Sequence, residues 1–516
     1  MSETWVNLAE RIGADLHLDL TGPGGRRAAL TRALRAAVRS GRLAPGTRLP
    51  PYRSLAADLG LARNTVGDAY AELVAEGWLT ARQGSGTRVA HRVEPSTSGR
   101  TPGHPSAPGR APAAGRAAAA GRAPVPGRAS ASGRAPASGR APVPGRAAAS
   151  SGARRADRPV HDLRQGQPDP SSFPRSAWLA SARRAVTAAP NDAFGPGDPR
   201  GRPELRHALA EYLARTRGVR ADPEAIVVCS GFAHALRLLF GGGVLRGPLA
   251  VEGYGLPFHR ELLARAGVRT RPLGVDADGA RIGELSGRER AVLLTPAHQF
   301  PTGGPLSAHR RTAAVGWACS ADRIVIEDDY DGEFRYDRRP IGALQGLAPD
   351  RVVYAGSVSK SLSPAVRLGW MVLPGHLVDA VLAAKGEREA WAGVLDQLTL
   401  ADFLRCGSYD RHVRRMRQRY RARRDRFATA LAERAPHVHA TGIAAGLHAV
   451  LRLPPGTEPA ALDAAARAGI ALDGLSAFRH PDAPFPPEDG LVVGYATPPD
   501  HAFGAALDAV LSVLPR

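Results

Sequence analysis

Hydrophobic residues near the start of the chain recur with the period of a helix. Leu30, Leu34 and Val38 lie four positions apart, which places them on one face of a helix over 27–41. Similar patterns predict two more helices and two strands: a helix around Leu55 that ends at Gly60, a helix over 62–76, and strands over 78–82 and 87–89. Three helices followed by a hairpin predict a winged helix-turn-helix.

The third of these helices begins with residues suited to DNA. Arg63, Asn64 and Thr65 lie at its N-terminal end, where a recognition helix meets base edges and phosphates. The alternative interpretation is a small helical interaction domain with no role in DNA binding.

The pattern changes beyond about residue 161, where short apolar runs alternate with helical stretches. The predicted strands are 226–229, 249–251, 291–294, 324–326 and 352–354, and helices are predicted over 233–240 and 307–319. Strands that alternate with helices are typical of an α/β domain with a mainly parallel sheet. Its functional residues are expected beyond the carboxyl ends of the strands.

Between these two parts the hydrophobic pattern disappears. A Gly-Arg-Ala hexamer repeats seven times in register, from Gly109-Arg110 to Gly145-Arg146, and no aromatic residue occurs over 92–159. Collagen would need glycine at every third position, so the repeat predicts a disordered linker instead. The predicted organisation is an N-terminal arm over 1–24, a DNA-binding domain over 25–90, the linker over 91–160 and the α/β domain over 161–516.

Composition adds a strong positive charge. The 69 Lys and Arg residues exceed the 48 acids by 21, which indicates a polyanionic partner. The segment 91–159 alone holds twelve arginines and two acids, so the linker is expected to add non-specific attraction to phosphates. No apolar run approaches the length of a membrane span, and the start of the chain lacks the pattern of a secretory signal. With three scattered cysteines, the expected location is the cytoplasm, in association with the nucleoid.

Only two of the 69 basic residues are lysines, Lys360 and Lys385. A lysine retained in an arginine-rich chain is a candidate for nucleophilic chemistry that a guanidinium cannot perform. Lys360 lies in a Ser-rich turn that follows a predicted strand and precedes Arg367, which suits a Schiff base beside a phosphate pocket. Lys385 has no such context and is predicted to be a surface residue.

Two other strand ends carry polar groups. Asp328 and Tyr330 follow the strand over 324–326 and project to the same side, where a carboxylate can hold a pyridine nitrogen protonated and a phenol can bond a ring oxygen. Ser230-Gly231 opens a helix whose free N–H groups can receive a phosphate. The competing interpretation is a metal site built from the oxygen ligands Glu327, Asp328, Asp329 and Asp331.

The first ninety residues resemble a known DNA-binding family. The segment GRLAPGTRLPPYRSLAADLGLARNTVGDAYAELVAEGWLTARQGSGTRV is similar to the GntR-type DNA-binding domain over about fifty residues. The chain has Ala62 where many relatives place a hydroxyl and Gly67 where some place an arginine. The predicted DNA contacts, which combine this resemblance with the position of the third helix, are Arg53, Arg63, Asn64, Thr65, Gln83 and Gly84.

The region 161–516 resembles the fold-type I pyridoxal-phosphate proteins, the aspartate aminotransferase-like class. The motif S-x-S-K-x-x-x-P-x-x-R at 357–367 carries most of this resemblance. It implies pyridoxal 5'-phosphate (PLP) as cofactor, no metal, and a smaller C-terminal α+β subdomain. The implied roles are Lys360 as the internal aldimine, Asp328 on the pyridine nitrogen, Tyr330 on the ring hydroxyl, Tyr254 stacked on the ring, and Ser357, Ser359 and Arg367 around the phosphate, with Gly231 and Phe232 also at the cofactor.

Two positions depart from the aminotransferase pattern. In TPAHQFPTG, Phe300 stands where aminotransferases place an asparagine, and in LVVGYA, Val492 replaces the arginine that holds the substrate carboxylate. A neutral aliphatic side chain cannot hold a carboxylate in a desolvated pocket. Arg479 is the candidate substitute, and a surface role is the competing interpretation of that residue.

The order of winged helix, linker and aminotransferase-like domain resembles the MocR/GabR-type transcriptional regulators. The resemblance implies a homodimer that binds operator DNA and responds to a small effector, which is PLP, an amine or an amino acid. One alternative is a working aminotransferase that carries a DNA-binding domain. The other is a cofactor-free dimerisation module, which the retained Lys360, Asp328 and Tyr330 disfavour.

Overall fold

The structure is a computed structural model that describes residues 20, 25–39, 43, 46–75, 78–82, 86–90, 159–336, 342–386, 392–442 and 445–515. The chain divides into two units, one formed by 1–92 with 159–516 and the other by 93–158. Nearly all of the predicted arm over 1–24 and of the predicted linker over 91–160 lies outside the described residues.

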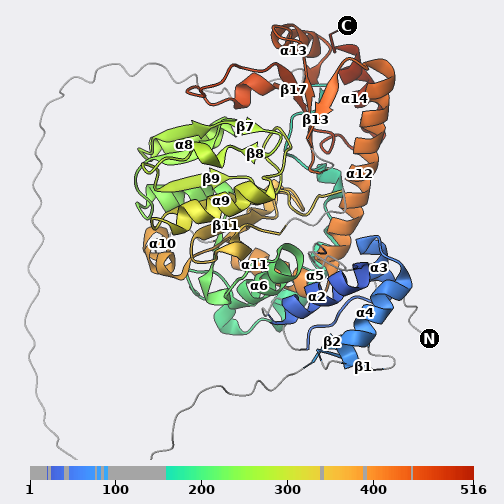
Figure 1. Ribbon diagram of the computed structural model, residues 1–516, viewed down its shortest axis with the longest axis vertical. Coiled ribbons are helices and arrows are strands. Elements are labelled where there is room, and N and C mark those ends of the chain that lie inside the picture. Colours follow the sequence, from blue (N-terminus) through green and yellow to red (C-terminus); the bar gives the residue numbers. More distant parts are fainter. Residues whose placement is uncertain are drawn as a thin grey trace, which may run out of the picture. The chain divides into compact units, whose positions relative to one another are not determined.

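The N-terminal part contains three helices and a hairpin (Figure 1). They are α2 (Arg26–Arg39), α3 (Tyr52–Leu59), α4 (Arg63–Ala75), β1 (Leu79–Arg82) and β2 (Gly86–Val89). One core holds the helices together because each contributes leucine or valine side chains that are almost fully buried, including Leu30, Leu34, Leu55, Val66 and Leu73. The antiparallel hairpin pairs Leu79 with Val89, which confirms the predicted winged helix.

The α/β part is built on a seven-stranded sheet in the order β4-β12-β11-β10-β9-β5-β6. These strands are β4 (Ile226–Cys229), β5 (Leu249–Glu252), β6 (Thr270–Leu273), β9 (Ala291–Leu294), β10 (Ile324–Asp328), β11 (Val352–Ser357) and β12 (Gly369–Val372). The strands from β11 to β6 are parallel, whereas β12 is antiparallel to both of its neighbours. The connection over 358–368 is too short for a helical crossover, so β12 returns beside β11 as an antiparallel strand.

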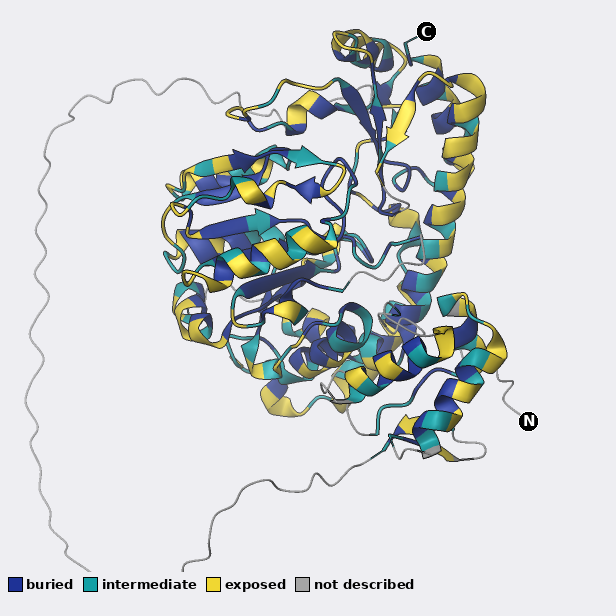
Figure 2. Cartoon of the chain, viewed as in Figure 1, coloured by how far each residue is buried: buried dark blue, intermediate teal, exposed yellow. Residues whose placement is uncertain are grey.

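Helices cover both faces of this sheet (Figure 1). The helices of this layer are α5 (Arg175–Ala188), α6 (Pro203–Arg217), α7 (Phe232–Leu236), α8 (Pro257–Arg265), α9 (Ala308–Cys319), α10 (Val378–Lys385) and α11 (Val394–Arg405). Successive residues of a strand enter opposite cores: Val228 packs with α6 and α11, whereas Val227 packs with α7, α8 and α10. Both faces are therefore apolar, and Figure 2 shows the strands as buried.

A smaller subdomain follows in the chain. Its antiparallel sheet has the order β13 (His439–Thr441), β14 (Ala449–Arg452), β17 (Gly490–Val493), β16 (Asp473–Gly474). The long helix α12 (Ser408–Arg434) and the helices α13 (Glu458–Arg467) and α14 (Asp500–Ser512) contribute to its core. A large sheet with a smaller α+β subdomain confirms the predicted fold class. No helix among the described residues is long and apolar enough to cross a membrane.

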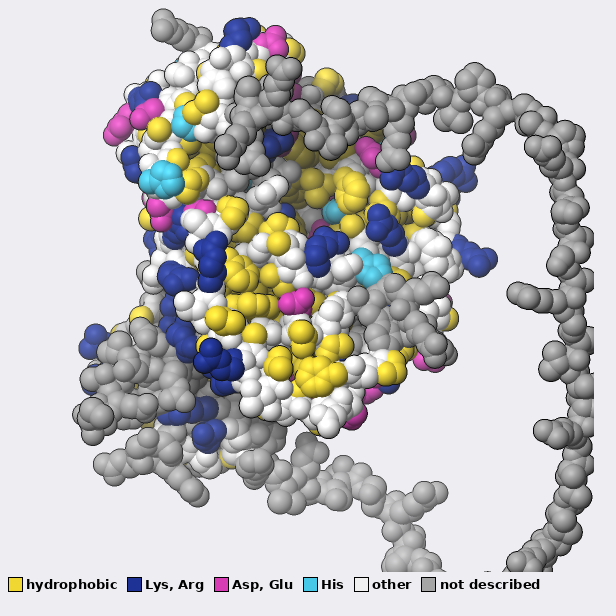
Figure 3. Space-filling model, turned by 180° about the vertical axis from the view of Figure 1, so that it is seen from behind, with side chains coloured by type: hydrophobic (Ala, Val, Ile, Leu, Met, Phe, Trp, Pro, Cys, Tyr) yellow, Lys and Arg dark blue, Asp and Glu magenta, His cyan; other side chains and the backbone are white. Residues whose placement is uncertain are grey.

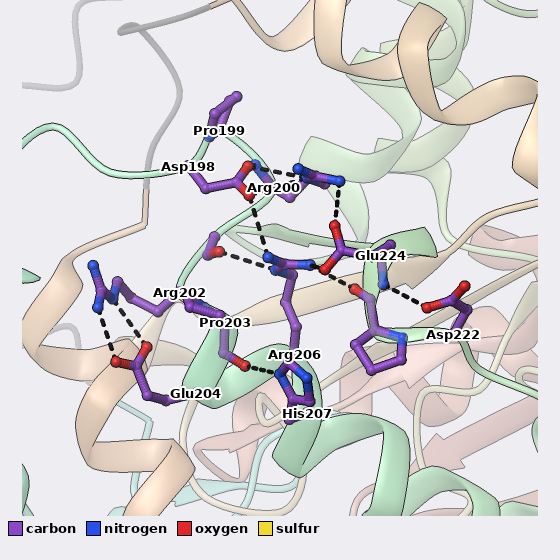
Figure 4. Close-up of polar contacts among 12 residues, drawn as sticks. Asp198, Pro199, Arg200, Arg202, Pro203, Glu204, Arg206, His207, Asp222 and Glu224 are labelled. Carbon is purple, nitrogen blue, oxygen red and sulfur yellow. Dashed lines mark hydrogen bonds and ion pairs between the residues drawn. The ribbon is translucent and has the colours of Figure 1, made fainter. Parts of the chain in front are cut away.

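An ion-pair network fixes the segment that leads into α6 (Figure 4). The buried Arg206 guanidinium donates to the Pro223 carbonyl at 2.8 Å and pairs with Glu224 at 2.7 Å and Asp198 at 3.2 Å. Arg200 pairs with the same two carboxylates. The network ties this loop to the turn before β4, the strand that leads to Ser230.

Lys385 is not a surface residue, so that prediction is wrong. Its side chain is 3% exposed at the end of α10, and its ammonium donates to the carbonyls of Val228, at 2.7 Å, and Pro199. Burial lowers the pKa of Lys385 to about 8. These two carbonyls replace water around the ammonium and join α10 to β4 and to the loop before α6.

Candidate functional site

A cavity of about 210 Å³ lies where β5, β10 and β11 end. The carboxyl ends of parallel strands meet at one edge of a sheet, so polar residues that follow different strands converge there. The cavity wall includes all nine residues predicted to contact the cofactor, which are Lys360, Asp328, Tyr330, Tyr254, Ser357, Ser359, Arg367, Gly231 and Phe232. The structure therefore brings together residues that are separated by up to 136 positions in the chain.

The turn between β11 and β12 presents Lys360. Its neighbour Ser361 is buried beneath it, where the Tyr409 hydroxyl donates to Ser361 Oγ at 2.7 Å and His412 Nε2 donates to the Ser361 carbonyl at 2.8 Å. Both partners belong to the first turns of α12. The turn is therefore held from below, so that the Lys360 amine faces the cavity.

The Lys360 amine is poised to lose its proton. It donates a hydrogen bond to the Gly166 carbonyl, and burial lowers its pKa, although the charges of Asp328 and Asp331 oppose this shift. Because a neutral amine is the nucleophilic form, burial increases the reactive fraction at neutral pH.

Asp328 is the carboxylate that faces Lys360. Burial raises its pKa well above the usual range, the negative charge of Asp329 adds to this effect, and Lys360 opposes it. A cation placed beside Asp328 would favour the ionised form. The site therefore suits a protonated ring nitrogen.

The neighbouring acids point to different partners. Glu327 accepts hydrogen bonds from the backbone of Leu344 and Gln345, at 2.7 and 2.9 Å, and Asp329 forms a 2.6 Å ion pair with Arg217. Among the residues that the structure describes, no three potential ligands gather as a metal site. The carboxylates considered for metal binding therefore serve separate interactions.

Tyr330 is bonded at the edge of the cavity. Its hydroxyl lies 2.8 Å from His298 Nδ1, and the same nitrogen lies 2.8 Å from Asp331 Oδ2. The sequence analysis selected the motif around His298 but considered only Phe300 in it. Its signal for the missing residue was therefore a histidine two positions before a proposed cofactor neighbour.

One end of the cavity is suited to an anion. Gly231 has a φ of +104°, and a side chain added there would meet open space. The first N–H groups of the helix that follows have no acceptor within it. The guanidinium of Arg367 is exposed and has no hydrogen-bond or ion-pair partner among the described residues, and Arg367 itself occupies the left-handed region at a φ of +55°. Strain of this kind is concentrated at functional sites.

Tyr254 also has an unused polar group. Its side chain is 3% exposed, yet its hydroxyl has no hydrogen-bond partner within the described part of the chain. A buried hydroxyl without a partner costs free energy, so a ligand that accepts this bond would recover it. Tyr254, Arg367 and the helix start thus fit a phosphorylated aromatic ligand.

An apolar wall lies beside these groups. Phe300 and Val492 belong to one buried cluster with Tyr254 and Phe478, and the rings of Phe300 and Phe478 are 5.3 Å apart. Arg479 does not enter the cavity wall, because its guanidinium donates to the carbonyls of Ala483, at 2.7 Å, and Phe485. Both departures from the aminotransferase pattern therefore make the same side of the site hydrophobic.

The sequence analysis missed two titratable groups of the cavity, Glu252 and His259. Glu252 Oε2 accepts hydrogen bonds from Thr295, at 2.5 Å, and Gln299, at 3.2 Å, and burial raises its pKa to about 7. Burial lowers the pKa of His259 to about 4. Glu252 ends β5 and precedes Tyr254, so its position at a strand end was the available signal.

The predicted DNA-binding residues lie on an accessible part of the winged helix. Arg63 and Asn64 are exposed, and Thr65 is half-buried, in the first turn of α4. Arg53 is exposed on α3. Gln83 and Gly84, predicted in the wing, lie outside the described residues.

Comparison with protein families supports both parts. Residues 27–89 match the family of bacterial regulatory proteins called the gntR family, and residues 158–483 match aminotransferase class I and II. The probable rhizopine catabolism regulatory protein MocR of Rhizobium meliloti is 33% identical over 90% of this chain and 89% of its own. The pyridoxine biosynthesis regulator PdxR of Corynebacterium glutamicum is 31% identical over 82% of each chain.

Solved structures resemble the α/β part. An archaeal alanine:glyoxylate aminotransferase has a TM-score of 0.62 and 24% identity, over 69% of this chain and 90% of its own. The α-aminoadipate aminotransferase LysN of Thermus thermophilus, solved with N-(5'-phosphopyridoxyl)-L-leucine, has a TM-score of 0.61 and 24% identity over 68% and 91%. These similarities establish the fold.

Proposed function

Because the chain belongs to the HTH-type transcriptional regulators in which a gntR-family domain precedes an aminotransferase class I and II domain, we propose that its second domain is a PLP-dependent sensor. The sensor binds PLP and responds to PLP itself, an amine or an amino acid. The response changes the affinity of the winged helix for operator DNA. Such a protein acts at the nucleoid, in the cytoplasm.

One observation carries this proposal, the convergence of the nine predicted residues on a single cavity. PLP supplies an electrophilic carbon and an electron-withdrawing ring. Lys360 would hold the cofactor through its amine, and Asp328 would keep the ring nitrogen protonated. Arg367 and the helix start at Gly231 would bind the phosphate, together with Ser357 and Ser359.

We also propose that the protein is a homodimer, as the resemblance implies. Large hydrophobic side chains on the second domain are between 41% and 62% exposed, namely Leu179, Val186, Phe194, Phe258 and Leu395. Figure 3 shows hydrophobic side chains gathered on one face of the chain. Exposed apolar surface of this kind supports a protein interface.

A working aminotransferase is the second candidate, and the apolar wall disfavours it. Val492 lies in the cluster with Phe300 and offers no charge to a substrate carboxylate. An assay of the first half-reaction with a panel of amino acids separates the candidates, because only an aminotransferase converts the bound cofactor to its amine form at a catalytic rate.

Substitution of Lys360 tests the proposed sensor. The wild-type protein should be yellow, and borohydride should attach the cofactor covalently at Lys360. Lys360→Ala and Lys360→Arg should both lose this attachment, since arginine keeps the charge but not the nucleophile. Both variants should retain basal DNA binding and lose the effector response. A Lys360→Ala protein in which borohydride still fixes the cofactor to another residue would contradict the assignment.

A further inference from the structure

We propose that His298 and Asp331 are positioning residues that direct the proton of the Tyr330 phenol into the cavity, toward the ring oxygen of the cofactor. This inference rests on the proposed binding of PLP. It assigns a role to a buried polar cluster that the predicted site does not include.

The cluster is assembled from separate segments and is closed to solvent. His298 is 4% exposed in the loop after β9, and Asp331 is 2% exposed in the turn after β10. His298 Nδ1 lies 2.8 Å both from Asp331 Oδ2 and from the Tyr330 hydroxyl. One ring nitrogen therefore serves two oxygen atoms.

The charge of Asp331 decides where the proton lies. A neutral imidazole carries its hydrogen on one nitrogen and a lone pair on the other. A lone pair on Nδ1 would repel the carboxylate at 2.8 Å, so the tautomer with hydrogen on Nδ1 is favoured. The Nδ1–H group then donates to Asp331 and toward the Tyr330 oxygen. The phenol cannot donate to this nitrogen, and its own hydrogen is left to point into the cavity.

Packing keeps this arrangement in place. Gly446 has a φ of +77°, and a Cβ atom there would lie 2.4 Å from His298 Cε1 and 2.8 Å from Asp331 Oδ2. His448 packs against His298 with ring centroids 5.6 Å apart, and its Nε2 lies 3.0 Å from the Pro301 carbonyl. The loop before β14 therefore covers the pair and limits rotation of the His298 ring.

Other titratable groups face the cluster from both sides. Asp328, Glu252 and Lys360 lie on the cavity side, whereas His448 and Arg424 line a small cavity of about 40 Å³ behind His298. Burial lowers the pKa of His448 to about 4, so this ring is neutral near pH 7. Burial also raises the pKa of Tyr330 well above its usual range, with the charges of Asp331, Asp328 and Glu252 adding to this effect, so the phenol keeps its proton.

The consequence is a change in the acidity of the bound cofactor. A phenol that donates to the ring oxygen stabilises its anionic form. The visible absorption band of the coloured protein should therefore change at a lower pH than it would without this donor. Without the His298–Asp331 pair, the phenol is free to turn its hydrogen away from the cavity.

The test is a pH titration of the visible absorption of cofactor-loaded protein. Asp331→Asn should raise the midpoint by about one pH unit, a tenfold change in proton affinity. His298→Phe should have the same effect and serves if Asp331→Asn does not fold. Asp331→Glu should restore part of the shift. Asp463→Asn, at an exposed position on α13, is the matched control and should leave the midpoint unchanged.

A double variant separates positioning from general structural damage. Tyr330→Phe should also raise the midpoint, and adding Asp331→Asn to it should have no further effect, because the pair acts through the phenol. A shift of equal size in the Tyr330→Phe background would overturn the proposal, and so would an unchanged midpoint in Asp331→Asn.

A measurement on cofactor-free protein is independent of PLP binding. Nitrogen NMR of ¹⁵N-histidine-labelled protein should find hydrogen on Nδ1 of His298, and hydrogen on Nε2 would overturn the proposal. A wild-type protein that never becomes coloured with PLP would instead contradict the proposed function, while this measurement still decides the state of His298.

Discussion

The Glu252 carboxyl occupies an unusual position, because it is buried in the cavity wall and has no cationic partner among its hydrogen bonds. Thr295 and Gln299 donate to it, but burial outweighs these bonds and raises its pKa to about 7. The folded protein therefore holds a proton on Glu252 that the unfolded chain releases near pH 4.5. The contribution of this group to stability falls as the pH rises from about 4.5 to about 7.

Glu252→Gln should remove this pH dependence. The wild-type protein should lose up to about 3 kcal/mol more than the variant between pH 5 and pH 8, since each pKa unit corresponds to about 1.4 kcal/mol. Urea unfolding of the cofactor-free proteins at both values measures the difference. The control is Glu261→Gln on α8, where the carboxylate is exposed, and its pH dependence should follow the wild type. Identical curves for wild type and Glu252→Gln would contradict the raised pKa.

The residues that the sequence analysis identified share a local signal, and those that it missed do not. Lys360 and Arg367 lie seven positions apart in one turn, so their association is visible in the sequence. The burial of Lys385 depends on carbonyls 157 and 186 positions away. The bonds between His298 and its partners likewise join segments about thirty residues apart. Such contacts arise from the way the sheet stacks its loops, which no local pattern reveals.

Among the elements, α4 carries the proposed DNA contacts. Arg63→Ala, in its exposed first turn, should weaken operator binding by about 1–3 kcal/mol if the side chain reads a base edge. A gel-shift titration measures this loss. Arg265→Ala on α8 removes the same charge from an exposed site on the second domain and should leave the affinity unchanged. Equal affinities for all three proteins would argue against this face of α4 as the DNA-reading surface.

Helix α10 depends on its last residue. Lys385→Met should lower the free energy of unfolding by about 1–3 kcal/mol, because the carbonyls of Val228 and Pro199 lose their donor while the buried volume stays similar. The variant should still be labelled at Lys360 by PLP and borohydride. Chemical unfolding and peptide mapping test the two statements, and loss of labelling without loss of stability would contradict this structural role.

The strands show which features of an element are predictable. Apolar runs place β4, β9 and β10 within two residues of their observed ends, because a buried strand needs a continuous run of such side chains. The reversed direction of β12 follows from the length of the turn that carries Lys360, a feature that hydrophobic periodicity does not encode. The helix predicted over 233–240 is divided into α7 and a π-helical turn over Arg237–Gly241.

For the whole molecule, charge distribution makes a separate prediction. Replacement of the seven repeat arginines of the linker by serine should flatten the salt dependence of DNA binding, by about 0.9 per lost phosphate contact in a plot of log affinity against log salt concentration. Operator preference should remain, because flexible arginines select no particular base. An unchanged slope would assign the linker a spacer role alone. Substitution of seven linker alanines by serine is the control for altered composition.

Helix α12 gives the turn beneath Lys360 a mechanical connection. Near its start, Tyr409 and His412 grip Ser361, and near its end, Phe427 and Leu431 are embedded in the core of the small subdomain. A helix of 27 residues is about 40 Å long and stiff along its axis. A tilt of only about 3° at the gripped end would move the far end by about 2 Å, the scale of known switching movements. The helix thus works as a lever whose short arm rests against the residue next to the reactive amine.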